Sequence, residues 1–324
     1  MNIQRWISRR EPNWQRLDIL LRQLEKKGLK SLQAGEIREL ASLYRSVTAD
    51  LARARTQQVG NTLTQSLQSL TTRAYTQIYQ GSRRQEWQAV VEFYRWGLPA
   101  VVQQTFAYIT AATGVFLLGA LIGWWYAWQD PTFVSLIVPE SLISQVRDEH
   151  KLWMGSIVGI EPLASSNITI NNLSVSFGAI GGGFTAGIWT TFLLWFNGLL
   201  IGALATLVSQ NNLAYPFWAF VFPHGSLELP AIFFAGGAGF LLAKAIVFPG
   251  KYRRPDALKF YGSQAAQLVF AIVPMLIIAG TIEGFFSPNP NVPNPLKYVV
   301  GMSLFMLLVA YCNRRQRIKV DSAL

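Results

Sequence analysis

The chain has 324 residues and a formal net charge of +11; 51% of its residues are hydrophobic and only 14% are charged. Because soluble domains carry about 25% charged residues, this composition indicates an integral membrane protein. Basic residues gathered at membrane ends explain the positive charge, so we expect no binding to nucleic acid. The single cysteine excludes an internal disulfide and a cysteine-based metal cluster.

The N-terminal part of the chain is polar, and residues 1–99 carry 16 of the 28 Lys and Arg. We expect residues 1–82 to form a cytoplasmic helical domain, since its start lacks an apolar run of signal-peptide length. Its first helix is predicted to open at Glu11-Pro12 and to stop at Gly28. The second helix shows the 3,4 spacing of a bundle seam: Ile37, Leu40, Tyr44, Val47, Leu51 and Ala54. This seam predicts either a bundle that closes on itself or a surface that docks a partner.

The next segment, residues 83–99, combines aromatic, aliphatic and arginine side chains directly before the first apolar segment. We expect an amphipathic helix that lies in the membrane interface.

Membrane-spanning segments are predicted in residues 100–313, which makes the chain an all-α, polytopic helical membrane protein. The candidate spans are residues 104–126, 173–188, 190–209, 227–248, 264–285 and 296–313. Residues 129–161 carry five acidic residues and only Arg147 and Lys151 as basic ones, so we place the 129–170 segment outside. The basic 250–260 loop and the basic tail 314–324 are placed inside. The preferred arrangement has six spans and both termini in the cytoplasm; the alternative has five, with residues 210–230 re-entrant.

Small residues predict where helices approach each other closely. Gly198 and Gly202 form a Gly-xxx-Gly pair, and Gly236 and Gly237 form a second candidate packing site.

A charge-free run covers residues 162–227 and ends at Glu228, four residues after His224. Ionisable groups in such apolar surroundings usually face a protein interior or a water-filled cavity. Pro223, Gly225 and Pro230 predict an interrupted helix at this point. With Asn197 and Glu283, these two residues form the candidate intramembrane polar site, which serves either proton or ion coupling or a structural hydrogen-bond network. No catalytic set, cofactor motif or metal cluster is predicted, because the chain has only two histidines.

Seven short segments between residues 37 and 310 carry a family resemblance by their order and spacing: Leu43-Tyr44-Arg45, residues 50–55, Ile78-Tyr79, and residues 196–203, 223–232, 235–239 and 282–288. They resemble the stage II sporulation protein M family of bacterial membrane proteins. The resemblance implies a membrane component that holds peptidoglycan-remodelling proteins and is not itself a hydrolase. The N-terminal domain resembles a broader, non-sporulation branch of that family, whose members often neighbour MoxR-type ATPases and RDD-family membrane proteins.

The first functional hypothesis is therefore a non-enzymatic scaffold or assembly factor for a membrane or envelope complex, in the bacterial inner (plasma) membrane. Its partners are the lipid bilayer and other proteins, including envelope-remodelling proteins, a MoxR-type ATPase or an RDD-family protein. The alternative is a transporter or channel subunit that uses the polar site around His224 and Glu228. The sequence does not determine whether the protein is a monomer or an oligomer.

Overall fold

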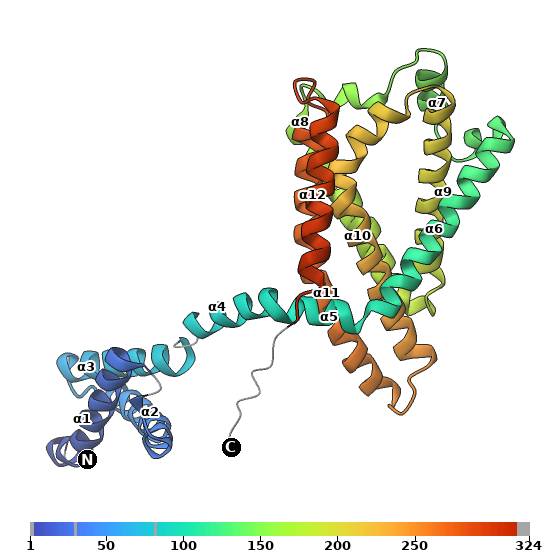
Figure 1. Cartoon of the computed structure of the whole chain (residues 1–324). Helices are drawn as coiled ribbons and strands as arrows, with labels where there is room; N and C mark the ends of the chain where they lie inside the picture. The colour runs from blue at the N-terminus through green and yellow to red at the C-terminus, as the bar shows by residue number, and fades with distance from the viewer. Residues whose placement is uncertain (1–2, 29–30, 81–82, 316–324) are drawn as a thin grey trace, which may run out of the picture. The chain divides into compact units, whose positions relative to one another are not determined.

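The computed structural model describes residues 3–28, 31–80 and 83–315, and those ranges contain helices and no strand. The chain divides into two compact units, Met1–Glu92 and Phe93–Leu324. Both units appear in Figure 1, where the colour follows the chain from blue to red. Each unit is described by itself.

The first unit contains α1 (Ile3–Lys27), α2 (Ala34–Thr56), α3 (Asn61–Tyr75), the π-helical turn η2 (Thr76–Gln80) and α4 (Arg83–Glu92). The prediction that a helix opens at Glu11-Pro12 is wrong, because α1 begins eight residues earlier and accommodates Pro12 in its interior. The predicted stop is confirmed: α1 ends at Lys27, and Gly28 adopts a φ of +74°, which glycine tolerates without strain.

The apolar seam of α2 faces the interior of this unit. Leu40, Val47 and Ala54 are buried against residues of α1 and α3, which include Leu17, Leu21, Leu67 and Leu70. The bundle thus closes on itself, while Ile37 at the end of the seam is 40% exposed.

A buried carboxylate fixes α1 against α2. Asp50 is 2% exposed and accepts hydrogen bonds from Arg10 Nε at 2.8 Å and from Trp14 Nε1 at 3.0 Å. Such charge-assisted bonds satisfy a carboxylate that would be costly to bury alone.

The expected interfacial helix over residues 83–99 is divided in the structure. α4 ends at Glu92, and the π-helical turn η3 (Phe93–Gly97) and α5 (Leu98–Gln104) belong to the second unit. Trp87 of α4 is 71% exposed.

The second unit is a helical bundle. Its elements are α5, α6 (Phe106–Gln129), η4 (Pro131–Leu136), α7 (Glu140–Arg147), η5 (Trp153–Ile157), α8 (Glu161–Gly181), η6 (Gly182–Thr185), α9 (Ile188–Gln210), α10 (Ala214–Val247), α11 (Arg254–Thr281), η7 (Ile282–Phe286) and α12 (Asn294–Cys312). Five helices of the described chain are long and apolar enough to cross a membrane: α6, α9, α10, α11 with η7, and α12.

A sixth bundle helix, α8, replaces the predicted span at residues 173–188. It begins at Glu161 and ends at Gly181, so the prediction placed both ends too late. The limit predicted at residue 170 for the segment after the first span is wrong, because residues 161–170 already belong to α8. Ser and Asn residues in the first half of α8 lower its apolarity, which is why a hydropathy criterion misplaces this helix.

The two chain ends of the bundle lie at the same side of it. Gln103 Nε2 donates hydrogen bonds to the carbonyl oxygens of Cys312, at 2.7 Å, and of Arg314, at 3.0 Å. Between these two hydrogen-bonded chain segments lie α8 and the five long apolar helices α6, α9, α10, α11 with η7, and α12.

α10 is central in the bundle and is continuous over 34 residues, although it contains Pro223 and Pro230. The predicted helix interruption and the re-entrant alternative for residues 210–230 are therefore wrong. Neighbouring helices and side chains can compensate backbone groups freed by proline. Between the two prolines, Ser226 Oγ donates a hydrogen bond to the Pro223 carbonyl at 2.9 Å.

Glycines allow α6 and α9 to run side by side in the same direction. A Cβ atom on Gly198 would lie 2.0 Å from the Phe116 carbonyl oxygen, and one on Gly202 would lie 2.0 Å from that of Ala120. Side chains larger than hydrogen cannot enter such a contact. Gly236 and Gly237 of α10 likewise face Leu194 and Ile109 at under 3 Å from an added Cβ.

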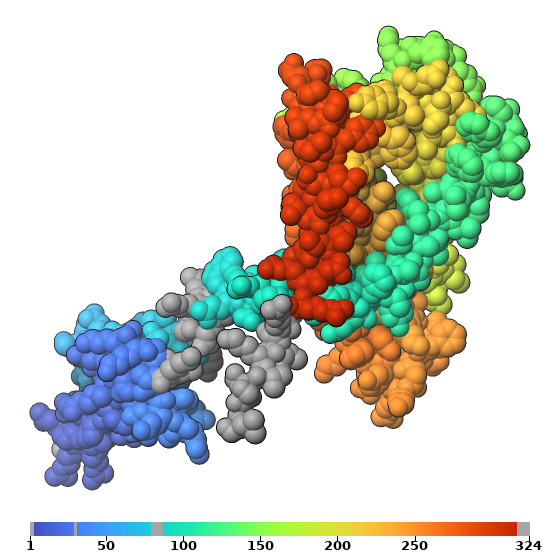
Figure 2. Space-filling model, in the orientation of Figure 1, coloured from blue at the N-terminus to red at the C-terminus, as the bar shows by residue number. Residues whose placement is uncertain are grey.

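α12 forms an outer edge of this unit, shown in red in Figure 2. Its large apolar side chains Val299, Met306 and Leu307 are 60–67% exposed. In a protein that spans a membrane, such a surface faces lipid.

Candidate functional site

Three titratable side chains from two segments meet in the bundle. α10 supplies His224 and Glu228, which share a helix face because they are four residues apart. The π-helical turn η7 supplies Glu283. One potential ligand atom from each side chain lies within 4.8 Å of the other two.

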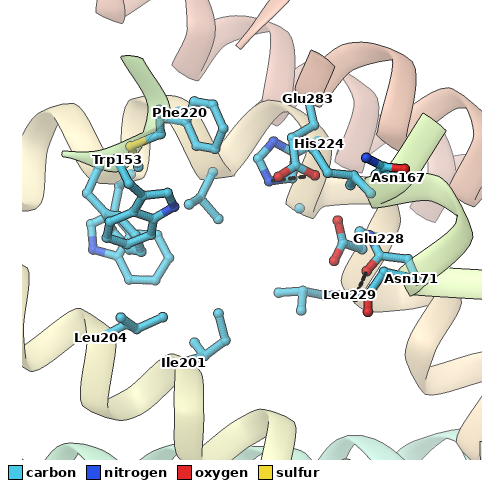
Figure 3. Close-up of a pocket in the computed structure, with 17 residues that line it drawn as sticks. Trp153, Asn167, Asn171, Ile201, Leu204, Phe220, His224, Glu228, Leu229 and Glu283 are labelled. Carbon is cyan, nitrogen blue, oxygen red and sulfur yellow. Dashed lines mark hydrogen bonds and ion pairs between the residues drawn. The ribbon is translucent and has the colours of Figure 1, made fainter. Parts of the chain in front are cut away.

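The imidazole of His224 is held between two oxygen groups. Its Nε2 lies 3.8 Å from Glu283 Oε2, and its Nδ1 lies 3.3 Å from Ser287 Oγ. His224 is 5% exposed and Ser287 is 1% exposed. Figure 3 shows His224 and Glu283 joined at this contact, with Glu228 next to them.

Amides of α8 complete the polar surroundings. Asn172 and Glu228 line the same cavity. Asn171 Nδ2 in turn lies 3.4 Å from Asn172 Oδ1. Asn167, one turn before Asn171, borders the same space in Figure 3.

Small residues bring α8 close to these carboxylates. A Cβ atom on Gly280 would lie 2.0 Å from Thr169 Oγ1, and one on Gly284 would lie 2.5 Å from Ser165 Cβ. Ser165 Oγ also donates a hydrogen bond to the Gly280 carbonyl at 2.9 Å. This close approach places α8 against α11 and against η7, which carries Glu283.

The three titratable side chains border a cavity of about 480 Å³. One side of it is polar, with the α8 amides and the carboxylates, and the other is apolar, with Ile201, Leu204 and Phe220 (Figure 3). Trp153 of η5 lies over the cavity, with its ring 5.9 Å from that of Phe217. The volume leaves room for water or a small ligand beside the charged groups.

The positions of two lysines, Lys297 on α12 and Lys244 on α10, decide how much positive charge lies near the site. Lys297 is 7% exposed, and its Nζ donates a hydrogen bond to the Ser287 carbonyl at 2.6 Å. Lys244 lies on α10 sixteen residues after Glu228, about 24 Å away along a continuous helix.

Of the residues predicted for the site, the structure brings together His224, Glu228 and Glu283 and leaves out Asn197. The Asn197 amide donates to the Leu193 carbonyl at 2.8 Å within α9. Sequence reasoning missed Asn172, Ser287 and Lys297. The i, i+4 spacing of Asn167 and Asn171 in a charge-free run was the available signal for a polar face on α8.

Comparison with known protein families decides the assignment of this unit. Residues 112–288, more than half of the chain, match the family model described as Stage II sporulation protein M. The chain belongs to the stage II sporulation protein M family. The matched region of this family member begins within α6, ends just after η7, and contains His224, Glu228 and Glu283.

Residues 4–80 match a different model, described as a domain of unknown function (DUF8413). The N-terminal resemblance around residues 43–79 therefore lies outside the family region, in a separate domain. Searches of curated proteins and of solved structures give no match to this family member.

Proposed function

We propose that this stage II sporulation protein M family member is a non-enzymatic scaffold that anchors partner proteins to the membrane. The observation that carries the proposal is the separately folded N-terminal unit. Its core, formed by α1, α2 and α3, is distinct from the cores of the membrane bundle. A compact helical domain attached to a membrane bundle is suited to hold a soluble partner at the membrane.

The outer surface of the N-terminal unit is the part available to a partner, because the α2 seam is used internally. Ile19 on α1 is 55% exposed and Ile37 on α2 is 40% exposed. Arg16 forms ion pairs with Glu39 at 2.8 Å and with Glu36 at 3.8 Å. Protein-binding surfaces combine an apolar centre with a polar rim, and these side chains supply both kinds of group.

The proposed location is the inner (plasma) membrane of a bacterium, with both termini in the cytoplasm. The basic loop between α10 and α11, which contains Lys251 and Arg253, supports this orientation. The predicted partners are those implied by the family resemblance: envelope-remodelling proteins, a MoxR-type ATPase or an RDD-family membrane protein.

Affinity purification in mild detergent tests the scaffold. The full-length protein should retain a stoichiometric partner that is lost when residues 1–82 are deleted, and Glu228→Gln should retain it. A partner that stays bound to the shortened protein would contradict docking through the N-terminal unit.

A second candidate function is ion- or proton-coupled transport, which the cavity beside His224, Glu228 and Glu283 favours. Membrane-embedded carboxylates that face a water-filled cavity are typical of ion pathways. Reconstitution in liposomes tests this candidate. Transport predicts an ion or proton flux that Glu228→Gln abolishes while the protein remains folded; an absence of flux in the wild type would leave the scaffold alone.

A further inference from the structure

We propose that His224, Glu228 and Glu283 bind one divalent first-row metal ion of the Zn²⁺ or Co²⁺ type inside the membrane bundle. This inference stands apart from partner docking, because it concerns the second unit only.

The three donor atoms are spaced as a single ion requires. An ion bound at about 2.1 Å to each donor holds the donors about 3–4 Å apart. His224 Nε2 and Glu283 Oε2 are 3.8 Å apart, and all three donors lie within 4.8 Å of one another. Small side-chain rotations are enough to bring Glu228 into the same coordination sphere.

The orientation of the imidazole is that of a metal ligand. A ligating histidine usually donates its second ring N–H to an oxygen, which leaves the other nitrogen free for the ion. Ser287 Oγ lies 3.3 Å from Nδ1, so it can hold the proton there, while Nε2 faces the carboxylates. Because His224 and Ser287 are both buried, bulk water cannot replace this arrangement.

The two carboxylates of the site, Glu228 and Glu283, favour a bound cation. Two carboxylates close together in an apolar bundle are costly unless they are paired or coordinate a metal. The amine of Lys297 is directed at the Ser287 carbonyl, and Lys244 is about 24 Å from Glu228 along α10. A divalent ion neutralises both glutamates, and the imidazole remains uncharged.

The donor set selects the class of ion. Imidazole nitrogen with carboxylate oxygen suits zinc and its neighbours in the first transition row, whereas Mg²⁺ and Ca²⁺ prefer oxygen donors alone. Three protein donors leave a fourth position, and the adjacent cavity of about 480 Å³ leaves room there for water or the Asn172 amide.

Titration with Co²⁺ tests the site in the full-length protein, purified in detergent without a polyhistidine tag and stripped with EDTA. The proposal predicts visible absorption bands that saturate at one Co²⁺ per chain, disappear when Zn²⁺ is added, and persist in excess Mg²⁺. A folded, stripped wild-type protein that binds neither Co²⁺ nor Zn²⁺ would overturn it.

The chain offers a matched control, because His150 and His224 are its two histidines. His224→Gln and Glu283→Gln should each weaken Co²⁺ binding at least tenfold, and His150→Gln should bind as the wild type does. Ser287→Ala should weaken binding about tenfold through loss of the histidine's hydrogen-bond partner; this variant decides the matter if the ligand variants misfold. Equal Co²⁺ affinity in the wild type, His224→Gln and Ser287→Ala would assign the ion elsewhere and refute the site.

Discussion

At the residue scale, one buried carboxylate connects the helices of the N-terminal unit. Replacing Asp50 with Ala leaves Trp14 Nε1 without its acceptor and Arg10 without its counterion. We expect a loss of about 3 kcal/mol in the free energy of unfolding. Urea unfolding of the fragment 1–82 measures it, with Glu11→Ala as a control at an exposed position. If Asp50→Ala changed the free energy of unfolding by less than about 0.5 kcal/mol, as the control should, the buried pair would contribute nothing to stability.

The ionisation of Asp18 makes the stability of this unit depend on pH. Burial acts to raise the pKa of its carboxyl group, but the hydrogen bond from Arg73 and the charges of Arg22 and Arg73 outweigh it and lower the pKa. A lowered pKa in the folded state means that the stabilisation is present above the unfolded value, about 3.9, and is lost as the pH falls through the folded value.

Fragment 1–82 should therefore lose stability below about pH 4. Asp18→Asn should remove part of that dependence and cost about 1 kcal/mol at pH 7. Thermal unfolding followed by circular dichroism at pH 3 and pH 7 measures both effects. A variant whose stability at pH 7 equals that of the wild type would contradict the ion pair with Arg73.

The candidate site shows what residue patterns can and cannot predict. The i, i+4 spacing placed His224 and Glu228 on one face of a helix, and the charge-free sequence around them marked that face as unusual. Glu283 was recognised only as a second membrane acid, because its approach to His224 depends on how α8, α10 and η7 pack. Asn197 was included because it is polar and intramembrane, yet its amide is satisfied inside its own helix.

At the scale of elements, the contact between α6 and α9 should be sensitive to the size of the side chain at position 198. Gly198→Ile places its Cβ atom 2.0 Å from the Phe116 carbonyl oxygen, so the helices must separate. Gly114→Ile on α6 is the matched control, because nothing lies within 4 Å of an added Cβ there. We expect the first variant to aggregate or to lose at least about 3 kcal/mol of stability, and the second to purify normally. Detergent size-exclusion chromatography separates these outcomes; identical profiles would refute the close packing.

Helix existence was easier to predict from the sequence than helix limits. The apolar segments predicted α6, α9 and α12 to within a few residues, whereas α11 begins ten residues before the predicted start at residue 264. α8 was misplaced because its first half is rich in Ser and Asn. These residues lower the hydropathy of the segment, so a hydropathy criterion does not recognise it as part of a bundle helix. α10 was expected to break at Pro223 and Pro230, and the central position of this helix allows it to continue through both.

At the scale of the whole molecule, the bundle predicts which segments share a side of the membrane. In a Cys312→Ser background, cysteines at Ser135 and Pro290 should react with a membrane-impermeant maleimide added outside intact cells, and one at Pro255 should not. All three positions are exposed, so the membrane alone decides reactivity. Labelling at residue 255 would contradict the proposed orientation.

The scaffold proposal depends on an N-terminal unit that folds and binds by itself. The most direct measurement adds purified fragment 1–82 to detergent-solubilised complexes of the full-length protein with its partner. The account predicts that the fragment releases the partner in proportion to its concentration, and that heat-denatured fragment does not. A folded fragment that releases none of the partner at a large molar excess would contradict the proposal that this unit is the docking site.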